Sequence, residues 1–152
     1  MKAVSHTYHY LAYHFVFATK NREPIIPKSI HEPLFAHMAA ILRAEGAACL
    51  KINGMPDHIH MLARLKTTHN VADIIRAVKS ETTGRLRQER GMGHFGWQIG
   101  YGAFTVSHSA IEAVRIYIET QEQHHGTTGL NEEFLALCRE NGIEIDEASM
   151  WD

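Results

Sequence analysis

Hydrophobic and polar residues alternate over 58–65, and this pattern predicts a β-strand with one face toward the core. The apolar face comprises Ile59, Met61, Ala63 and Leu65, and the other face comprises His58, His60, Leu62 and Arg64. Side chains two positions apart on a strand point to the same side. The pattern therefore places His58 and His60 next to each other on the face that can carry chemistry.

The rest of the chain predicts three further strands and four helices. We expect strands at 8–19, 49–53 and 97–106, and helices at 29–44, 70–90, 109–125 and 132–139, followed by an extended tail. Capping boxes at 29–32 and 109–112 and a cap at Asn70 mark three helix starts, and Gly46 marks one end.

This order of elements is that of a ferredoxin-like, split βαβ sandwich of the α+β class. We expect one antiparallel sheet with helices on one face and the other face open. A length of 152 residues fits a single domain. We place the domain at 1–128, with an acidic C-terminal helix and tail at 129–152 that pack on it or extend from it.

Charge is divided unevenly along the chain. Residues 1–111 hold 13 Lys or Arg against 7 Asp or Glu, whereas residues 112–152 hold 2 against 10. A basic body of this kind is compatible with a nucleic-acid surface, although an acidic solvated tail is also a common neutral feature. Two distant cysteines, Cys49 and Cys138, form no disulfide framework, and the start of the chain lacks the pattern of a signal peptide. We expect a cytoplasmic protein.

The predicted helix at 70–90 has one basic face. At 100° per residue, five side chains fall within a sector of about 80°: Arg76, Lys79, Thr83, Arg87 and Arg90. The opposite side is apolar, so this face is either the solvated side of an amphipathic helix or a phosphate-binding surface. The neighbouring cations Arg64, Lys66 and Arg85 favour the phosphate-binding surface.

Two imidazoles can hold a metal ion jointly, but the local sequence offers no third ligand, and strand histidines also commonly face water. On the predicted helix at 109–125, Tyr117 and Gln121 are four residues apart and share a face with His124. That face presents a phenol together with a polar ligand. The alternative for Tyr117 is an amphipathic packing residue with its hydroxyl at the surface.

These segments together resemble the single-tyrosine transposases of the HUH endonuclease superfamily, which include small insertion-sequence and REP-associated tyrosine transposases. The resemblance rests on the segments 19–24, 55–60 (Met-Pro-Asp-His-Ile-His), 78–79 and 117–121 (Tyr-Ile-Glu-Thr-Gln). It implies that His58, His60 and Gln121 bind a divalent metal, Mg²⁺ or Mn²⁺, and that Tyr117 is the nucleophile.

The resemblance also implies the activity. The substrate would be single-stranded DNA at hairpin-bearing element ends, cleaved and rejoined through a 5′-phosphotyrosine, and the protein would be a homodimer with shared active sites. The cations expected at the DNA are Arg64, Lys66, Arg76, Lys79, Arg87 and Arg90. The sequence leaves two alternatives open, a domesticated REP-type nuclease and a non-catalytic module that binds single-stranded nucleic acid.

Overall fold

The computed structural model describes residues 6–125 and 129–151, except for the side chains of His124 and His125. The element order is β1 (Leu11–Ala18), α1 (His31–Ala44), β2 (Ala48–Met55), β3 (His58–Leu65), α2 (Val71–Glu89), β4 (Gly102–Val106), α3 (Ile111–Glu119), α4 (Gln121–His125) and α5 (Leu130–Glu140). Short 3₁₀ turns precede α1 and α3. No helix of these residues combines the length and hydropathy of a membrane span.

The four strands form one antiparallel sheet in the order β2-β3-β1-β4. The first strand lies between β3 and β4, so that both crossover helices connect strands that are not neighbours, as in the expected split βαβ fold. This confirms the α+β, ferredoxin-like class. In the register of β1 and β3, Phe17 lies opposite Ile59 and Val16 lies opposite His60.

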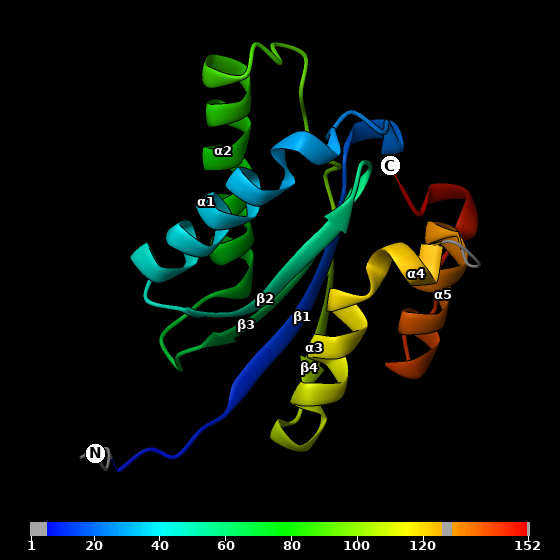
Figure 1. Ribbon diagram of the computed structural model, residues 1–152. Coiled ribbons are helices and arrows are strands. Elements are labelled where there is room, and N and C mark those ends of the chain that lie inside the picture. Colours follow the sequence, from blue (N-terminus) through cyan, green and yellow to red (C-terminus); the bar gives the residue numbers. More distant parts are fainter. Residues whose placement is uncertain (1–5, 126–128, 152) are drawn as a thin grey trace.

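Helices α1 and α2 cover one face of the sheet (Figure 1). The odd-numbered face of β3 packs against them, and Ile59 and Met61 are fully buried. Met38 and Leu42 of α1 and Val78 of α2 complete this core. The apolar residues of the alternating pattern over 58–65 therefore face the core, as predicted.

The opposite face is not open, and this expectation is wrong. Helices α3 and α5 lie on that side of the sheet (Figure 1). Leu62 of β3 packs with Ile118 of α3, and Val16 of β1 packs with Phe134 of α5. Because this face carries apolar side chains beside its histidines, helices cover it and remove the apolar surface from water.

The C-terminal segment folds back rather than extending. Trp151 packs on Phe134 with ring centroids 5.2 Å apart, and its indole Nε1 donates to Asn131 Oδ1 at 2.7 Å. Asp146 Oδ1 accepts from the backbone of Ala148 and caps a short 3₁₀ turn at Glu147–Ser149. The expectation of an extended tail is therefore wrong.

Local signals at the helix ends have mixed outcomes. Asn70 caps α2 by accepting from Asp73 N, as predicted. Ser29 and Ser109 instead lie inside 3₁₀ turns, and the residues that precede α1 and α3 make no side-chain cap, so neither capping box forms. The predicted helix at 109–125 is broken at Thr120, and the predicted strand at 97–106 is regular only from Gly102.

Candidate metal and tyrosine site

His58 and His60 lie on the covered face of β3, one behind the other. Their side chains are 1% and 0% exposed. A histidine that merely faces water would be largely exposed, so that alternative is wrong for both residues. Burial of two polar rings requires hydrogen-bond partners, and both rings have them.

A second residue orients each imidazole. His58 Nδ1 donates to Asp57 Oδ1 at 2.7 Å, which leaves the lone pair of Nε2 directed into the site. His60 Nδ1 lies 2.8 Å from His14 Nε2. Either nitrogen of this pair can donate to the other, depending on which one carries the proton. Histidine ligands in metal sites commonly have a partner of this kind on the distal nitrogen. The arrangement prepares the Nε2 atoms of His58 and His60 for ligation.

The sequence interpretation missed His14. It lies on β1 opposite Leu62, and therefore on the same face of the sheet as His60. Burial, and then the neighbouring His60, lower the pKa of His14 to about 3. A neutral His14 can accept a hydrogen bond from His60 Nδ1, which a doubly protonated ring could not do.

Gln121 and Glu133 complete the polar cluster. Gln121 is fully buried, with its Oε1 3.4 Å from His58 Nε2. Glu133 of α5 is 6% exposed, with its Oε1 2.8 Å from His60 Nε2 and 3.8 Å from His58 Nε2. The sequence did not single out Glu133. The available signal is its place beside the apolar stripe formed by Leu130, Phe134 and Cys138.

These residues fit a divalent cation. The nearest ligand atoms of His58, His60 and Glu133 all lie within 4.8 Å of one another. Adjacent ligands around an octahedral ion at about 2.1 Å are about 3 Å apart. The 2.8 Å between His60 Nε2 and Glu133 Oε1 matches this spacing, whereas the 3.8 Å between His58 Nε2 and Glu133 Oε1 requires a small side-chain shift around an ion. A mixed set of nitrogen and oxygen donors accepts several divalent metals, so the donor set does not fix the identity of the ion.

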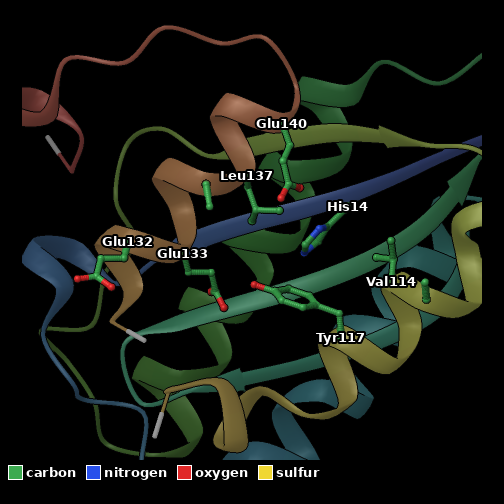
Figure 2. A pocket seen from close by; sticks show the side chains of 9 residues that line it. His14, Val114, Tyr117, Glu132, Glu133, Leu137 and Glu140 are labelled. Atoms are coloured by element: carbon green, nitrogen blue, oxygen red, sulfur yellow. The ribbon is translucent and has the colours of Figure 1, made fainter. Parts of the chain in front are cut away.

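Tyr117 extends from α3 toward this cluster. Its ring centroid lies 5.9 Å from that of His60 and 6.1 Å from that of His14. Figure 2 shows its hydroxyl directed at the carboxylate of Glu133. Burial, followed by the hydrogen bond and charge of Glu133, raises the pKa of Tyr117 well above its usual value. Tyr117 is half-buried and its ring packs beside Ile118, so it combines a packing role with a hydroxyl that faces Glu133.

A cavity of about 370 Å³ opens beside Tyr117, between α3 and α5. His14 and Glu133 line the cavity where it meets the polar cluster, and Glu132 and Glu140 add further carboxylates (Figure 2). A phosphodiester that enters this cavity meets negative charge on α5. Neutralisation of that charge is therefore part of any reaction with DNA at Tyr117.

The predicted DNA-contacting cations lie away from this cluster, and three of them contact backbone carbonyls. Lys79 Nζ donates to the carbonyls of Gln98 and Gly100, each at 2.8 Å, and burial lowers its pKa to about 8. Arg87 donates to the carbonyl of Phe95 through two nitrogens. Arg64 donates to the carbonyl of His9 and lies over the ring of Tyr10.

The other three are exposed. Arg76 pairs with Asp73 at 2.7 Å and is 73% exposed, and Lys66 and Arg90 also face solvent. A groove of about 680 Å³ runs between α2 and the segment 96–101, with Arg76, Lys79 and Arg87 among its lining residues. The side chain of His124, which was expected beside Tyr117, lies outside the described residues.

Comparison with known proteins agrees with this geometry. A profile of the family "Transposase IS200 like" matches residues 7–121. The ISDra2 transposase TnpA of Deinococcus radiodurans is 25% identical over 117 residues, which cover 73% of this chain and 84% of that protein.

Two solved structures share the fold. A candidate transposase from Deinococcus radiodurans R1 superposes with a TM-score of 0.61 and 26% identity, over 80% of this chain and 98% of that one. A REP-associated tyrosine transposase bound to a REP hairpin superposes with a TM-score of 0.62 and 16% identity, over 84% of this chain and 76% of that one. The matched residues 7–121 include His58, His60, Tyr117 and Gln121, and the chain therefore belongs to the IS200-like transposases, of the single-tyrosine HUH type.

Proposed function

We propose that this protein is a metal-dependent transposase that cleaves and rejoins single-stranded DNA through Tyr117. The observation that carries the proposal is the convergence of a tyrosine hydroxyl on two buried, oriented imidazoles and their oxygen neighbours. His58 and His60 come from one strand, and Tyr117 and Gln121 come from the two sides of a helix break. The family membership supports the same reaction class.

His58, His60 and Gln121 would hold the cation, with Glu133 as a fourth ligand. When bound, Mg²⁺ or Mn²⁺ supplies a Lewis acid that stabilises charge on the scissile phosphate. The carboxylate of Glu133 would then share its charge with the cation rather than face Tyr117 alone. Asp57 and His14 orient the two imidazoles through their Nδ1 atoms.

Tyr117 would carry out the covalent step. Its phenol oxygen attacks phosphorus and loses its proton, a new oxygen–phosphorus bond forms, and the bond to the 3′-oxygen of the neighbouring nucleotide breaks. The products are a 5′-phosphotyrosine and a free 3′-hydroxyl. Attack by a 3′-hydroxyl on the phosphotyrosine reverses the step and joins strands, so that the ester bond is exchanged without ATP.

The proposed substrate rests on a structural neighbour and on the cations of the surface groove. One structural neighbour holds a REP hairpin, and we propose a hairpin-bearing single strand as the partner of this chain. The groove between α2 and 96–101 offers Arg76 to phosphates and Tyr101 to bases. We also propose a homodimer. In the described chain Tyr117 lies beside the histidines of its own subunit, which favours cleavage in cis.

A covalent adduct tests the function. The protein is incubated with Mn²⁺ and single-stranded oligonucleotides from the flanks of its gene, and the denatured products are examined for protein-linked DNA. We expect an adduct that Tyr117→Phe abolishes and that Tyr13→Phe, a tyrosine packed on the other face of the sheet, retains. Binding of these strands without an adduct would favour the non-catalytic module instead. Palindromes at both ends of the gene would indicate a mobile element, and scattered repeats a domesticated nuclease.

The proposed role of Glu133 has its own test. Glu133→Gln keeps the size of the side chain and removes its charge, so Mn²⁺ affinity measured by calorimetry should fall about 10-fold or more. Glu132→Gln on the same helix is the control. Equal affinity of Glu133→Gln and the wild type would exclude the carboxylate from the ligand set.

A further inference from the structure

The break between α3 and α4 separates the nucleophile from the proposed third ligand. Tyr117 precedes the break at Thr120 and Gln121 follows it. The last carbonyls of a helix have no partner within the helix and need other donors. Whatever holds this junction therefore determines how Tyr117 and Gln121 lie relative to each other.

Asn53 of β2 holds the junction. Its Nδ2 donates to the carbonyl of Ile118 at 2.9 Å and to the carbonyl of Glu119 at 3.2 Å. Its Oδ1 accepts from the backbone N–H of Gly54 at 2.9 Å. Because both ends of the amide are engaged, the side chain is fixed in one orientation, with its donor on the last turn of α3.

The same residue is fixed relative to the histidines. Asn53 lies directly opposite His60 in the antiparallel ladder, and so on the same face of the sheet. Next to it, a Cβ on Gly54 would meet the carbonyl oxygen of His58 at 2.5 Å, which shows how closely β2 approaches β3 here. One side chain thus connects the end of the tyrosine helix to the strand that carries both imidazoles.

Two ion pairs also reach the junction. Lys51 reaches Glu119 at 3.5 Å, and Lys28 reaches Glu122 at 2.5 Å between two exposed side chains. Exposed ion pairs of this kind contribute little because water and salt screen them. Thr120 Oγ1 donates to Ile116 O at 3.0 Å and Gln121 Nε2 donates to Tyr117 O at 3.4 Å, both within the helical segment.

We propose that Asn53 is a positioning residue that holds Tyr117 and Gln121 in place over His58 and His60. The inference rests on the proposed function, since it assigns Asn53 a part in assembling that site. The side-chain amide of Asn53 contacts the backbone of Ile118, Glu119 and Gly54, and Asn53 does not line the cavity at Tyr117, so it acts through the backbone of Ile118 and Glu119.

Asn53→Asp tests this assignment. The substitution keeps the side-chain size and the acceptor for Gly54 N–H, but it replaces the donor by an oxygen that faces two carbonyls. We expect Mn²⁺ affinity, measured by calorimetry on the full chain, to fall about 10-fold or more. The rate of adduct formation should fall with it, while the affinity for single-stranded DNA remains that of the wild type. If Asn53→Asp does not fold, Asn53→Ala is measured in its place.

Asn70→Ala is the matched control. It removes another asparagine cap, at the N-terminus of α2, and so gives a comparable change in thermal midpoint far from the cluster. We expect its Mn²⁺ affinity to match the wild type. Unchanged Mn²⁺ affinity in the Asn53 variant, or an equal loss in Asn70→Ala, would overturn the proposal. If the wild type formed no adduct, the proposed function would fail, and calorimetry alone would still decide the role of Asn53.

Discussion

His14 illustrates how a residue can act on the candidate metal site through another side chain. It is 3% exposed, and its ring is hydrogen-bonded to that of His60. For His60 Nε2 to bind a cation, the proton must sit on Nδ1, and that proton needs an acceptor. His14 Nε2 supplies this acceptor at 2.8 Å.

His14→Phe should therefore weaken metal binding. Phenylalanine fills most of the same space but accepts no hydrogen bond, so Mn²⁺ affinity should fall about 10-fold to 100-fold. Calorimetric titration of the purified variant measures this. Tyr13→Phe, which changes the neighbouring residue on the other face of β1, should bind Mn²⁺ as the wild type does. Full affinity in His14→Phe would refute the role of His14.

The lowered pKa of His14 also predicts a dependence of stability on pH. An unfolded chain protonates this imidazole near pH 6.5, whereas the folded chain keeps it neutral down to about pH 3. Its contribution to stability is complete above about pH 6.5 and is lost as the pH falls toward 3. Between about pH 7 and pH 5 the loss should approach about 2 kcal/mol. Urea unfolding at both pH values should show a smaller loss for His14→Phe, and equal losses would contradict the assignment.

At the scale of elements, α5 is the part of the site that lies beyond the residues matched to the family. It brings Glu133 to His60, and Phe134 and Cys138 hold it against β1 and β4. Trp151 in turn packs on Phe134 from the folded-back C-terminal segment. The position of Glu133 therefore depends on residues that follow it by almost twenty positions.

Trp151→Ala should loosen this helix. Loss of the ring removes apolar burial and the hydrogen bond to Asn131, and we expect a cost of about 2 kcal/mol on α5. Hydrogen exchange should speed up in α5 and remain slow in β1 and β3. Exchange that is accelerated equally in all these elements would show that the C-terminal segment stabilises the whole domain instead.

At the scale of the whole molecule, the cations of α2 and the histidine cluster lie on different faces of the sheet. Helix α2 packs on one face, and α3 and α5 pack on the other. A DNA strand that contacted both α2 and Tyr117 would pass around the edge of the sheet where β4 begins. The segment 96–101, which lines the groove beside α2, leads directly into that end of β4. Binding and cleavage should then respond to different substitutions.

Neutralising Arg76 and Arg90 together should reduce affinity for single-stranded DNA and flatten its dependence on salt. Each lost phosphate contact lowers the slope of log affinity against log salt by about 0.7. Fluorescence anisotropy at several salt concentrations measures the slope, with Lys28→Gln as a control cation elsewhere on the surface. An unchanged slope would show that α2 does not contact phosphates.

The sequence predicts the fold and part of the candidate site because both follow short periodicities. Alternation over 58–65 indicates the paired histidines, and helical spacing places Tyr117 and Gln121 on one face. In β1 the alternation fails, because this central strand buries Phe15 and Phe17 on one face and Ala12 and Val16 on the other, so His14 has no polar face to mark it.

The parts of the site that the sequence does not predict depend on contacts between distant segments. Glu133 meets His60 across 73 positions, and an acidic residue near a helix start usually faces solvent. The break at Thr120 follows no glycine or proline, and its junction is held by Asn53 on another strand. The place of Glu133 beside the apolar stripe of α5 is the one local signal of the two features, and it does not indicate His60 as the partner.

The family match ends at Gln121, so both imidazoles, the phenol and the amide lie inside it, whereas the carboxylate of Glu133 on α5 lies outside it. The negative charge beside Tyr117 therefore comes from a helix beyond the matched residues. The C-terminal segment is thus a natural point at which to tune metal preference in engineered strand transferases.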